Sequence, residues 1–136
     1  MTKVIKLSAD ADDKTALRGA GVSLMVMFGS HVTGNRHPGS DIDIGVLFKD
    51  LKQKEADPVD VYGTLSDVLA RIFPGKRLDI VYLHEAPLSL RFRAAMEGEL
   101  LYAESPTLAA DFKEYAMKMY FDFKPVEEEF KQVIFG

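Results

Sequence analysis

Residues 29–43 read GSHVTGNRHPGSDID, and the interpretation of the whole chain depends on this stretch. The apolar run before it, LMVMF at residues 24–28, predicts a short buried strand that ends at Gly29 and Ser30. Residues 31–40 are rich in Gly, Asn, Pro, His and Ser, which predicts a loop. Polar and apolar residues then alternate at the start of DIDIGVLF, residues 41–48, which predicts a second strand. The stretch is therefore expected to join two strands through a polar loop.

The second strand opens with two carboxylates on one side. Asp41 and Asp43 are two positions apart, so their side chains point to the same face of the strand. Neighbouring carboxylates repel each other unless a cation lies between them, and Mg²⁺ prefers carboxylate and phosphate oxygens. Gly29 lets a phosphate approach the backbone closely, and the Ser30 hydroxyl and the amides after it can donate hydrogen bonds. The pattern predicts a site for magnesium and a phosphate-bearing ligand such as a nucleoside triphosphate.

A third carboxylate, Asp79, interrupts an apolar strand predicted over residues 77–83, RLDIVYL. A charged side chain in such a run needs a partner. If this strand lies beside residues 41–48, all three carboxylates meet, and the arrangement suits catalysis by two metal ions. Asp79 would then bind an ion or accept the proton of the attacking hydroxyl. A salt bridge to Arg77, or an aspartate that simply lies at a strand end, is the purely structural alternative.

The remaining elements are predicted to be mostly helical. Ser8 or Asp10 caps a short helix that ends at Gly19 and Gly21. Further helices are predicted from Pro58 to Pro74, from Pro87 to Gly98 and from Pro106 onwards, with a short edge strand over residues 100–102. The apolar stripes of the first and last of these are expected to be Tyr62, Leu65, Leu69 and Ile72, and Leu108, Phe112, Tyr115 and Met119. Pro125 is expected to end or kink the last one, before a final helix carrying Val126, Phe130, Val133 and Ile134.

These elements predict an α/β (α+β) fold, with a small mixed sheet of three or four strands flanked by helices. The 136 residues are the length of one domain, so we expect residues 1–136 to form a single domain with residues 105–136 as a C-terminal helical extension. There is no cysteine, so disulfides, thiolate zinc sites and cysteine nucleophiles are excluded.

Charge and hydropathy narrow the expected partners. The net charge is −4 and no basic block is present, so we expect no direct binding to nucleic acid. No apolar run approaches the ~18 residues that cross a membrane, and the N-terminus lacks the apolar region of a signal peptide. We therefore expect no membrane association and a cytoplasmic location.

Gly-Ser, ten residues, Asp-Ile-Asp and a later Asp in an apolar strand resemble the minimal nucleotidyltransferase (MNT) domains of the DNA polymerase β superfamily. Residues 99–130, ELLYAESPTLAADFKEYAMKMYFDFKPVEEEF, resemble the tail of MNT-type antitoxins, which are encoded beside HEPN-domain ribonuclease toxins. The resemblance implies a polymerase β-like core. It also implies Mg²⁺-dependent transfer of AMP from ATP to a tyrosine hydroxyl of the partner HEPN toxin, which silences the toxin.

The resemblance also implies roles for individual residues. Asp41, Asp43 and Asp79 would be the catalytic carboxylates and would bind two Mg²⁺ ions. The residues implied to hold the ATP triphosphate are Gly29, Ser30, Gly34 and Ser40. Arg36 is expected to bind the triphosphate as well, and Arg36, Lys76 and Arg77 are the candidates to replace missing positive charge. The family's loop commonly reads Gly-Ser-Arg-x-Arg-Gly, whereas this chain has His31 and Thr33 in place of the arginines, and neither neutral side chain matches a guanidinium on a triphosphate.

Two other functions fit the same residues. A small molecule is the acceptor in aminoglycoside nucleotidyltransferases, but 136 residues leave little room for an acceptor-binding region unless a second subunit supplies it. An antitoxin that inhibits by binding alone, with a weak or inactive site, is favoured by the missing loop arginines.

Overall fold

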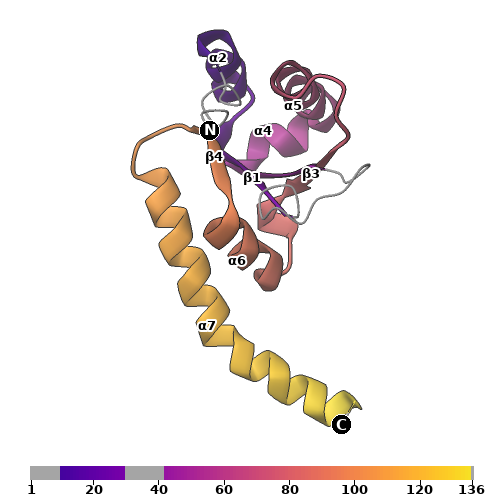
Figure 1. The fold of residues 1–136 in the computed structure, drawn as a ribbon, viewed down its shortest axis with the longest axis vertical. Coiled ribbons are helices and arrows are strands. Elements are labelled where there is room, and N and C mark those ends of the chain that lie inside the picture. Colours follow the sequence, from indigo (N-terminus) through magenta and orange to yellow (C-terminus); the bar gives the residue numbers. More distant parts are fainter. Residues whose placement is uncertain (1–9, 30–41, 136) are drawn as a thin grey trace.

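The structure is a computed structural model that describes residues 10–29 and 42–135, with side chains up to residue 125 (Figure 1). Its centre is a four-stranded sheet made of β1 (Val22–Phe28), β2 (Ile42–Phe48), β3 (Leu78–Tyr82) and β4 (Glu99–Ala103). The strand order is β3-β2-β1-β4. β1 runs antiparallel to β2 and to β4, whereas β2 and β3 run parallel. The predicted mixed sheet is confirmed.

Helices cover both sides of this sheet. They are α2 (Ala11–Gly19), α4 (Leu51–Ala56), α5 (Pro58–Ile72), α6 (Leu88–Glu97) and α7 (Leu108–Phe135), with a 3₁₀ turn η1 (Leu83–Glu85) after β3. Asp10 caps α2 as predicted, because its carboxylate accepts a 2.8 Å hydrogen bond from the Asp13 amide. Pro58 occupies the start of α5, where a missing amide proton costs nothing.

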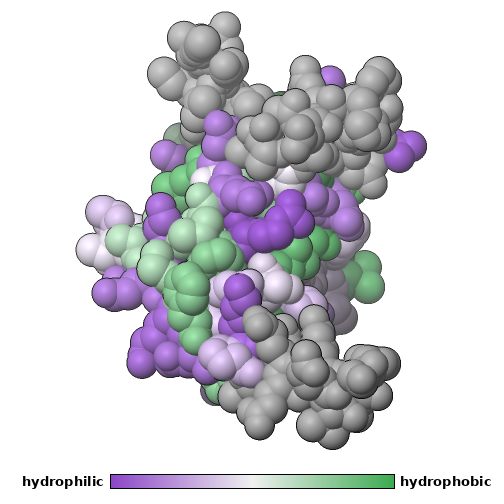
Figure 2. Space-filling model, turned by 60° about the horizontal axis from the view of Figure 1, so that its bottom comes forward, coloured by the Kyte–Doolittle hydropathy of each residue, from purple (hydrophilic) through white to green (hydrophobic). Residues whose placement is uncertain are grey.

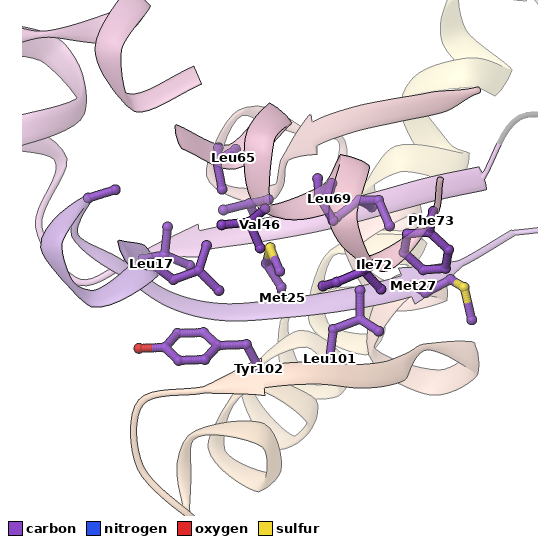
Figure 3. Close-up of a cluster of buried hydrophobic side chains, with 14 of the residues drawn as sticks. Leu17, Met25, Met27, Val46, Leu65, Leu69, Ile72, Phe73, Leu101 and Tyr102 are labelled. Carbon is purple, nitrogen blue, oxygen red and sulfur yellow. The ribbon is translucent and has the colours of Figure 1, made fainter. Parts of the chain in front are cut away.

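One side of the sheet, which we call the closed face, carries the main core beneath α2 and α5 (Figure 3). Alternate residues of β1 and β2, among them Met25, Ile42 and Ile44, point to this side and are almost fully buried. α5 adds Leu65 and Leu69, which are completely buried. The apolar side chains at every second strand position therefore pack against those at every third or fourth helix position. Together they form one continuous apolar layer.

The other side, which we call the open face, is covered by α6 and the first half of α7. Its core is smaller and contains Leu24, Phe28, Leu83, Ala94 and Phe112. Beyond α6 the long helix α7 continues away from the sheet, and its C-terminal end forms the far tip of the molecule (Figure 1). Large apolar side chains of α7, including Phe121 and Phe123, are about half exposed there.

Four details of the sequence interpretation were wrong. Val61, not Tyr62, lies on the buried stripe of α5, and Tyr62 is 51% exposed. On α7 the buried residues are Phe112 and Ala116, while Tyr115 points outward. Pro125 lies inside one continuous helix, α7, so no separate final helix begins after it. Finally, α4 was not predicted, because none of its residues is buried and no apolar period marks it.

Candidate active site

Two of the three predicted carboxylates lie next to each other. Asp43 of β2 and Asp79 of β3 are directly paired in the parallel register of these strands. Paired residues of adjacent strands point to the same face, about 4.8 Å apart along the sheet. Their neighbours Ile42, Ile44 and Ile80 pack into the core of the closed face, so both carboxylates project from the open face. The condition set by the sequence, that the strand of Asp79 lies beside the strand of Asp43, is met.

Gly29 brings the end of β1 against the same place. Phe28, the residue before it, is paired with Asp43. Gly29 has a φ of +94°, a conformation that costs residues with a side chain about 1–2 kcal/mol. A Cβ at this position would also overlap the Asp43 carboxylate, so only glycine leaves room for that group. The strand end, the carboxylate and the glycine therefore form one compact unit.

The pair sits where a ligand can reach it. β2 and β3 begin at this end of the sheet, and β1 ends there, so Asp43 and Asp79 lie at strand termini. Asp79 is exposed and Asp43 is half-buried. Partial burial of one carboxylate beside an exposed one raises the repulsion between them, because the local dielectric constant is lower than that of water. A divalent cation relieves that repulsion, and the oxygen donors present are those that Mg²⁺ prefers.

The rest of the predicted site lies outside the described residues. This applies to Ser30, Gly34, Arg36, Ser40 and Asp41, and to the loop positions His31 and Thr33. Within residues 10–29 and 42–135 there is no group of three acidic, histidine or cysteine side chains close enough to hold a metal ion. The described part of the site is thus a pair of carboxylates, and the third carboxylate of the hypothesis belongs to a part of the chain not described.

A second charged cluster occupies the opposite end of the same strands. Lys54 of α4 donates a 2.6 Å hydrogen bond to Glu85, and its ammonium group lies 5.2 Å from the centre of the Tyr82 ring. The hydrogen bond from Lys54 lowers the pKa of Glu85, and the same bond raises the pKa of Lys54. His84 stacks parallel to Tyr82. This cluster could not be predicted from residue patterns, because the helix that supplies Lys54 has no apolar pattern.

The surface of the open face combines polar and apolar regions. Figure 2 brings the side of α6 and α7 forward and shows green apolar residues gathered among purple polar ones. Phe92 of α6 stacks on Tyr120 of α7 with a ring separation of 4.2 Å, and Phe121 meets both rings edge-on. These contacts hold α7 against α6.

In the described part of the chain, no helix is long and apolar enough to cross a membrane.

The glycine at the end of β1 and the carboxylates on β2 and β3 together point to a class of protein. Residues 14–107, more than half of the chain, match the family Polymerase beta, Nucleotidyltransferase, and the chain belongs to this family. Among individual proteins, the protein adenylyltransferase MntA of Aphanizomenon flos-aquae (strain 2012/KM1/D3) is 26% identical over 112 residues. The match spans 79% of this chain and 74% of that relative.

Solved structures show the same fold. A toxin-antitoxin crystal structure with AMP-PNP has a TM-score of 0.65 and 23% identity, and the match covers 90% of this chain and 94% of that chain. The complex of the tri-AMPylated Shewanella oneidensis HEPN toxin with MNT antitoxin has a TM-score of 0.60 and 22% identity, covering 98% of this chain and 94% of that chain. The likeness to both extends beyond the family match into α7.

Proposed function

We propose that this chain is an antitoxin that transfers AMP from ATP to a tyrosine hydroxyl of a partner HEPN ribonuclease toxin. The observation that carries the proposal is the pairing of Asp43 with Asp79 at the end of β1, where Gly29 leaves space for the carboxylate. Membership of the nucleotidyltransferase family supports the reaction class. The adenylyltransferase relative and the toxin complexes of similar fold support AMP as the group and the toxin as the acceptor. The reaction would take place in the cytoplasm.

The proposed roles follow from position. Asp41, Asp43 and Asp79 would hold two Mg²⁺ ions, and the loop residues Ser30, Gly34, Arg36 and Ser40 would hold the triphosphate with Gly29. When bound, the ions would neutralise the triphosphate and lower the pKa of the attacking hydroxyl. Because Gly29 has no side chain beside Asp43, phosphate oxygens would be able to approach the backbone amide groups there.

Asp79 is suited to accept the proton. Its exposure lets a tyrosine of another protein reach it, which the half-buried Asp43 does not allow to the same extent. The tyrosine oxygen forms a bond to the α-phosphorus of ATP, the bond from that phosphorus to the pyrophosphate oxygen breaks, and the hydroxyl proton passes to the Asp79 carboxylate. The modified tyrosine gains a bulky anionic group, which blocks an RNA-cleaving site by charge and volume.

The test uses ATP labelled on its α-phosphate, Mg²⁺ and the toxin encoded beside this chain. We expect label on the toxin with the wild type and about a thousandfold less with Asp43→Asn. Asp67→Asn is the matched control, because Asp67 is an exposed carboxylate on α5, on the other side of the sheet. Equal labelling by wild type and Asp43→Asn contradicts the proposal. Label on an added aminoglycoside instead of the toxin identifies a small-molecule transferase.

A binding-only antitoxin is the second candidate, favoured by His31 and Thr33 in place of two loop arginines. The same assay separates it from the first. If Asp41→Ala still silences the toxin and no label is transferred by the wild type, inhibition is steric.

A further inference from the structure

Arg77 lies directly before β3, at the end of the sheet that carries the candidate active site. Its carbonyl oxygen accepts a 3.0 Å hydrogen bond from the Ile42 amide, so the pairing of β3 with β2 already includes the backbone of Arg77. The register continues from there, with Leu78 beside Ile42 and then Asp79 beside Asp43. The backbone of Arg77 is therefore held next to the paired carboxylates.

The side chain of Arg77 belongs to the open face. Leu78 and Ile80 pack against the core of the closed face, whereas Val81 packs against the core of the open face. Because successive side chains of a strand alternate between the faces, Arg77 falls on the same face as Asp79, two residues further along. Two residues of a parallel strand span about 6–7 Å. An exposed guanidinium group thus stands at the outer border of the carboxylate pair.

The neighbouring cation, Lys76, is placed differently. Its amide donates a 3.3 Å hydrogen bond back to the Phe73 carbonyl at the end of α5, and Gly75 before it has a φ of +74°. Lys76 therefore belongs to the turn between α5 and β3, whereas Arg77 is bonded to β2. Both residues are exposed and carry the same charge, so they form a matched pair that differs in position relative to the site.

Two arginines of α6 are engaged within their own part of the chain. The Arg91 guanidinium donates a 3.1 Å hydrogen bond to the Ala86 carbonyl, and the Nε atom of Arg93 lies 3.7 Å from a carboxylate oxygen of Glu97. Arg77, by contrast, is joined by its backbone to the strand of Asp43. Among the cations of the described residues, we therefore single out Arg77 as the one built into the site.

The chemistry at this position favours a phosphate ligand. In the proposed reaction the α-phosphorus of ATP lies at the carboxylate pair, so the β- and γ-phosphates extend beyond it. A guanidinium group donates two parallel hydrogen bonds to phosphate oxygens and stays charged throughout. The chain has His31 and Thr33 where related loops carry arginine, so this positive charge must come from another part of the sequence.

We propose that Arg77 binds the β- and γ-phosphates of ATP and stabilises them as the leaving pyrophosphate. This inference rests on the proposed function, since it takes ATP as the substrate. When the bond between the α-phosphorus and the bridging oxygen breaks, its electron pair stays on the pyrophosphate oxygen. The guanidinium group donates hydrogen bonds to this growing charge and gives up no proton. Recognition of the pyrophosphate portion of the nucleotide is then a property of Arg77.

Calorimetric titration of the full chain with ATP and Mg²⁺, without the toxin, tests the binding role. Arg77→Gln is expected to raise the dissociation constant of ATP at least about tenfold, and that of inorganic pyrophosphate by a similar factor. Arg77→Lys is expected to give an intermediate value, because an ammonium group keeps the charge but loses the planar fork. Lys76→Gln removes the same charge one residue away, and we expect it to change either constant less than about twofold.

Transfer of AMP to the toxin tests the leaving-group role. Arg77→Gln is expected to lower kcat as well as to raise KM for ATP, with kcat/KM reduced about a hundredfold, because the contact strengthens as the pyrophosphate gains charge. A residue that only supported the fold would change thermal unfolding and leave pyrophosphate binding intact. Unfolding curves of each variant therefore accompany the titrations, and Arg77→Lys serves where Arg77→Gln does not fold.

The possible failures are distinguishable. A wild type that binds ATP and labels the toxin, with an Arg77→Gln variant that does both equally well, overturns this inference and leaves the proposed function standing. Equal weakening by Lys76→Gln also overturns it, since the effect would then be one of overall charge. Loss of ATP binding in Arg77→Gln with unchanged pyrophosphate binding would place the contact elsewhere on the nucleotide. A wild type that neither binds ATP nor labels the toxin removes the proposed function and this inference together.

Discussion

The closed and open faces of the sheet are built for different purposes. Within the described residues, the cluster of the closed face contains sixteen buried residues, and the cluster of the open face contains seven. The open face instead carries the paired carboxylates Asp43 and Asp79 on adjacent strands. Most of the apolar burial that stabilises the domain is on the other side of the sheet. Stability and chemistry are therefore separated across a single layer of strands.

Two aspartates, one on each face, give the sharpest test of this separation. Asp43→Asn is expected to reduce AMP transfer about a thousandfold while leaving the melting temperature equal or higher, because it removes one of two repelling charges. Asp13 is buried beneath α5 and accepts 2.9 and 2.7 Å hydrogen bonds from the Arg71 guanidinium. Asp13→Asn is expected to lower the free energy of unfolding by about 1 kcal/mol, a value reduced by the exposure of Arg71, with transfer unchanged.

AMP-transfer assays and thermal unfolding of both variants test whether Asp43 serves the reaction and Asp13 serves stability. A large loss of stability in Asp43→Asn with retained transfer would assign that residue to the fold. A loss of transfer in a folded Asp13→Asn would assign the closed face a part in the chemistry.

Matched leucine truncations compare the packing of the two faces. Leu69 is completely buried on α5, and Leu69→Ala is expected to reduce the free energy of unfolding by about 3 kcal/mol. Leu90 on α6 is only partly buried against the open face, so Leu90→Ala is expected to cost about 1 kcal/mol. Urea denaturation measures both. Equal costs would mean that the open face contributes as much to stability as the closed face.

Two glycines test the backbone beside the site. Gly29→Ala places a Cβ on the Asp43 carboxylate at a φ of +94°, so we expect about a hundredfold loss of transfer and about 2 kcal/mol of stability. Gly63 lies in α5 with open space around it, and Gly63→Ala is expected to stabilise the domain by about 0.5–1 kcal/mol. Transfer by a folded Gly29→Ala at the wild-type rate would show that the close approach has no catalytic importance.

The smallest expected effect concerns the charged cluster at the far end of β3. The hydrogen bond from Lys54 lowers the pKa of Glu85 below its ordinary value of 4.5. A carboxylate with a depressed folded-state pKa stabilises the fold above its unfolded pKa, and this contribution is lost as the pH falls through the folded value. Glu85→Gln is expected to lower the melting temperature slightly at pH 7 and to match the wild type once the pH is well below 4.5. Glu114→Gln, an exposed glutamate on α7, is the control.

Much of the fold and part of the site could be predicted from residue patterns. The alternation of Asp43 between Ile42 and Ile44 fixed its direction, because the period of a strand is two and one face was apolar. Asp79 stood out because a charge interrupts an apolar strand. The sheet order was beyond this reasoning, since pairing between distant strands leaves no mark on local sequence. From the sequence, the pairing of β2 with β3 could be stated only as a condition for the site. The observed register meets this condition.

The errors have local causes. On α5, Val61 and Tyr62 are adjacent apolar residues, and spacing alone does not decide which one faces the core. Pro125 removes one hydrogen bond from α7, but residues 121–125 are all exposed, so water can reach the freed carbonyl and the helix continues. α4 is held by its Asp50 cap and by a 2.6 Å hydrogen bond from Gln53 to the Gly19 carbonyl, neither of which follows from a hydrophobic pattern.

The late position of β4 in the chain has a consequence for synthesis on the ribosome. β1 is buried along all seven residues, yet one of its two partners is β4, which begins about seventy residues after β1 ends. Until that segment has emerged from the exit tunnel, the apolar strand VSLMVMF is completed on one side only. A nascent chain that stalls or is truncated before residue 99 therefore exposes an apolar strand that lacks one partner. We expect chaperones to bind such a chain and proteases to degrade it.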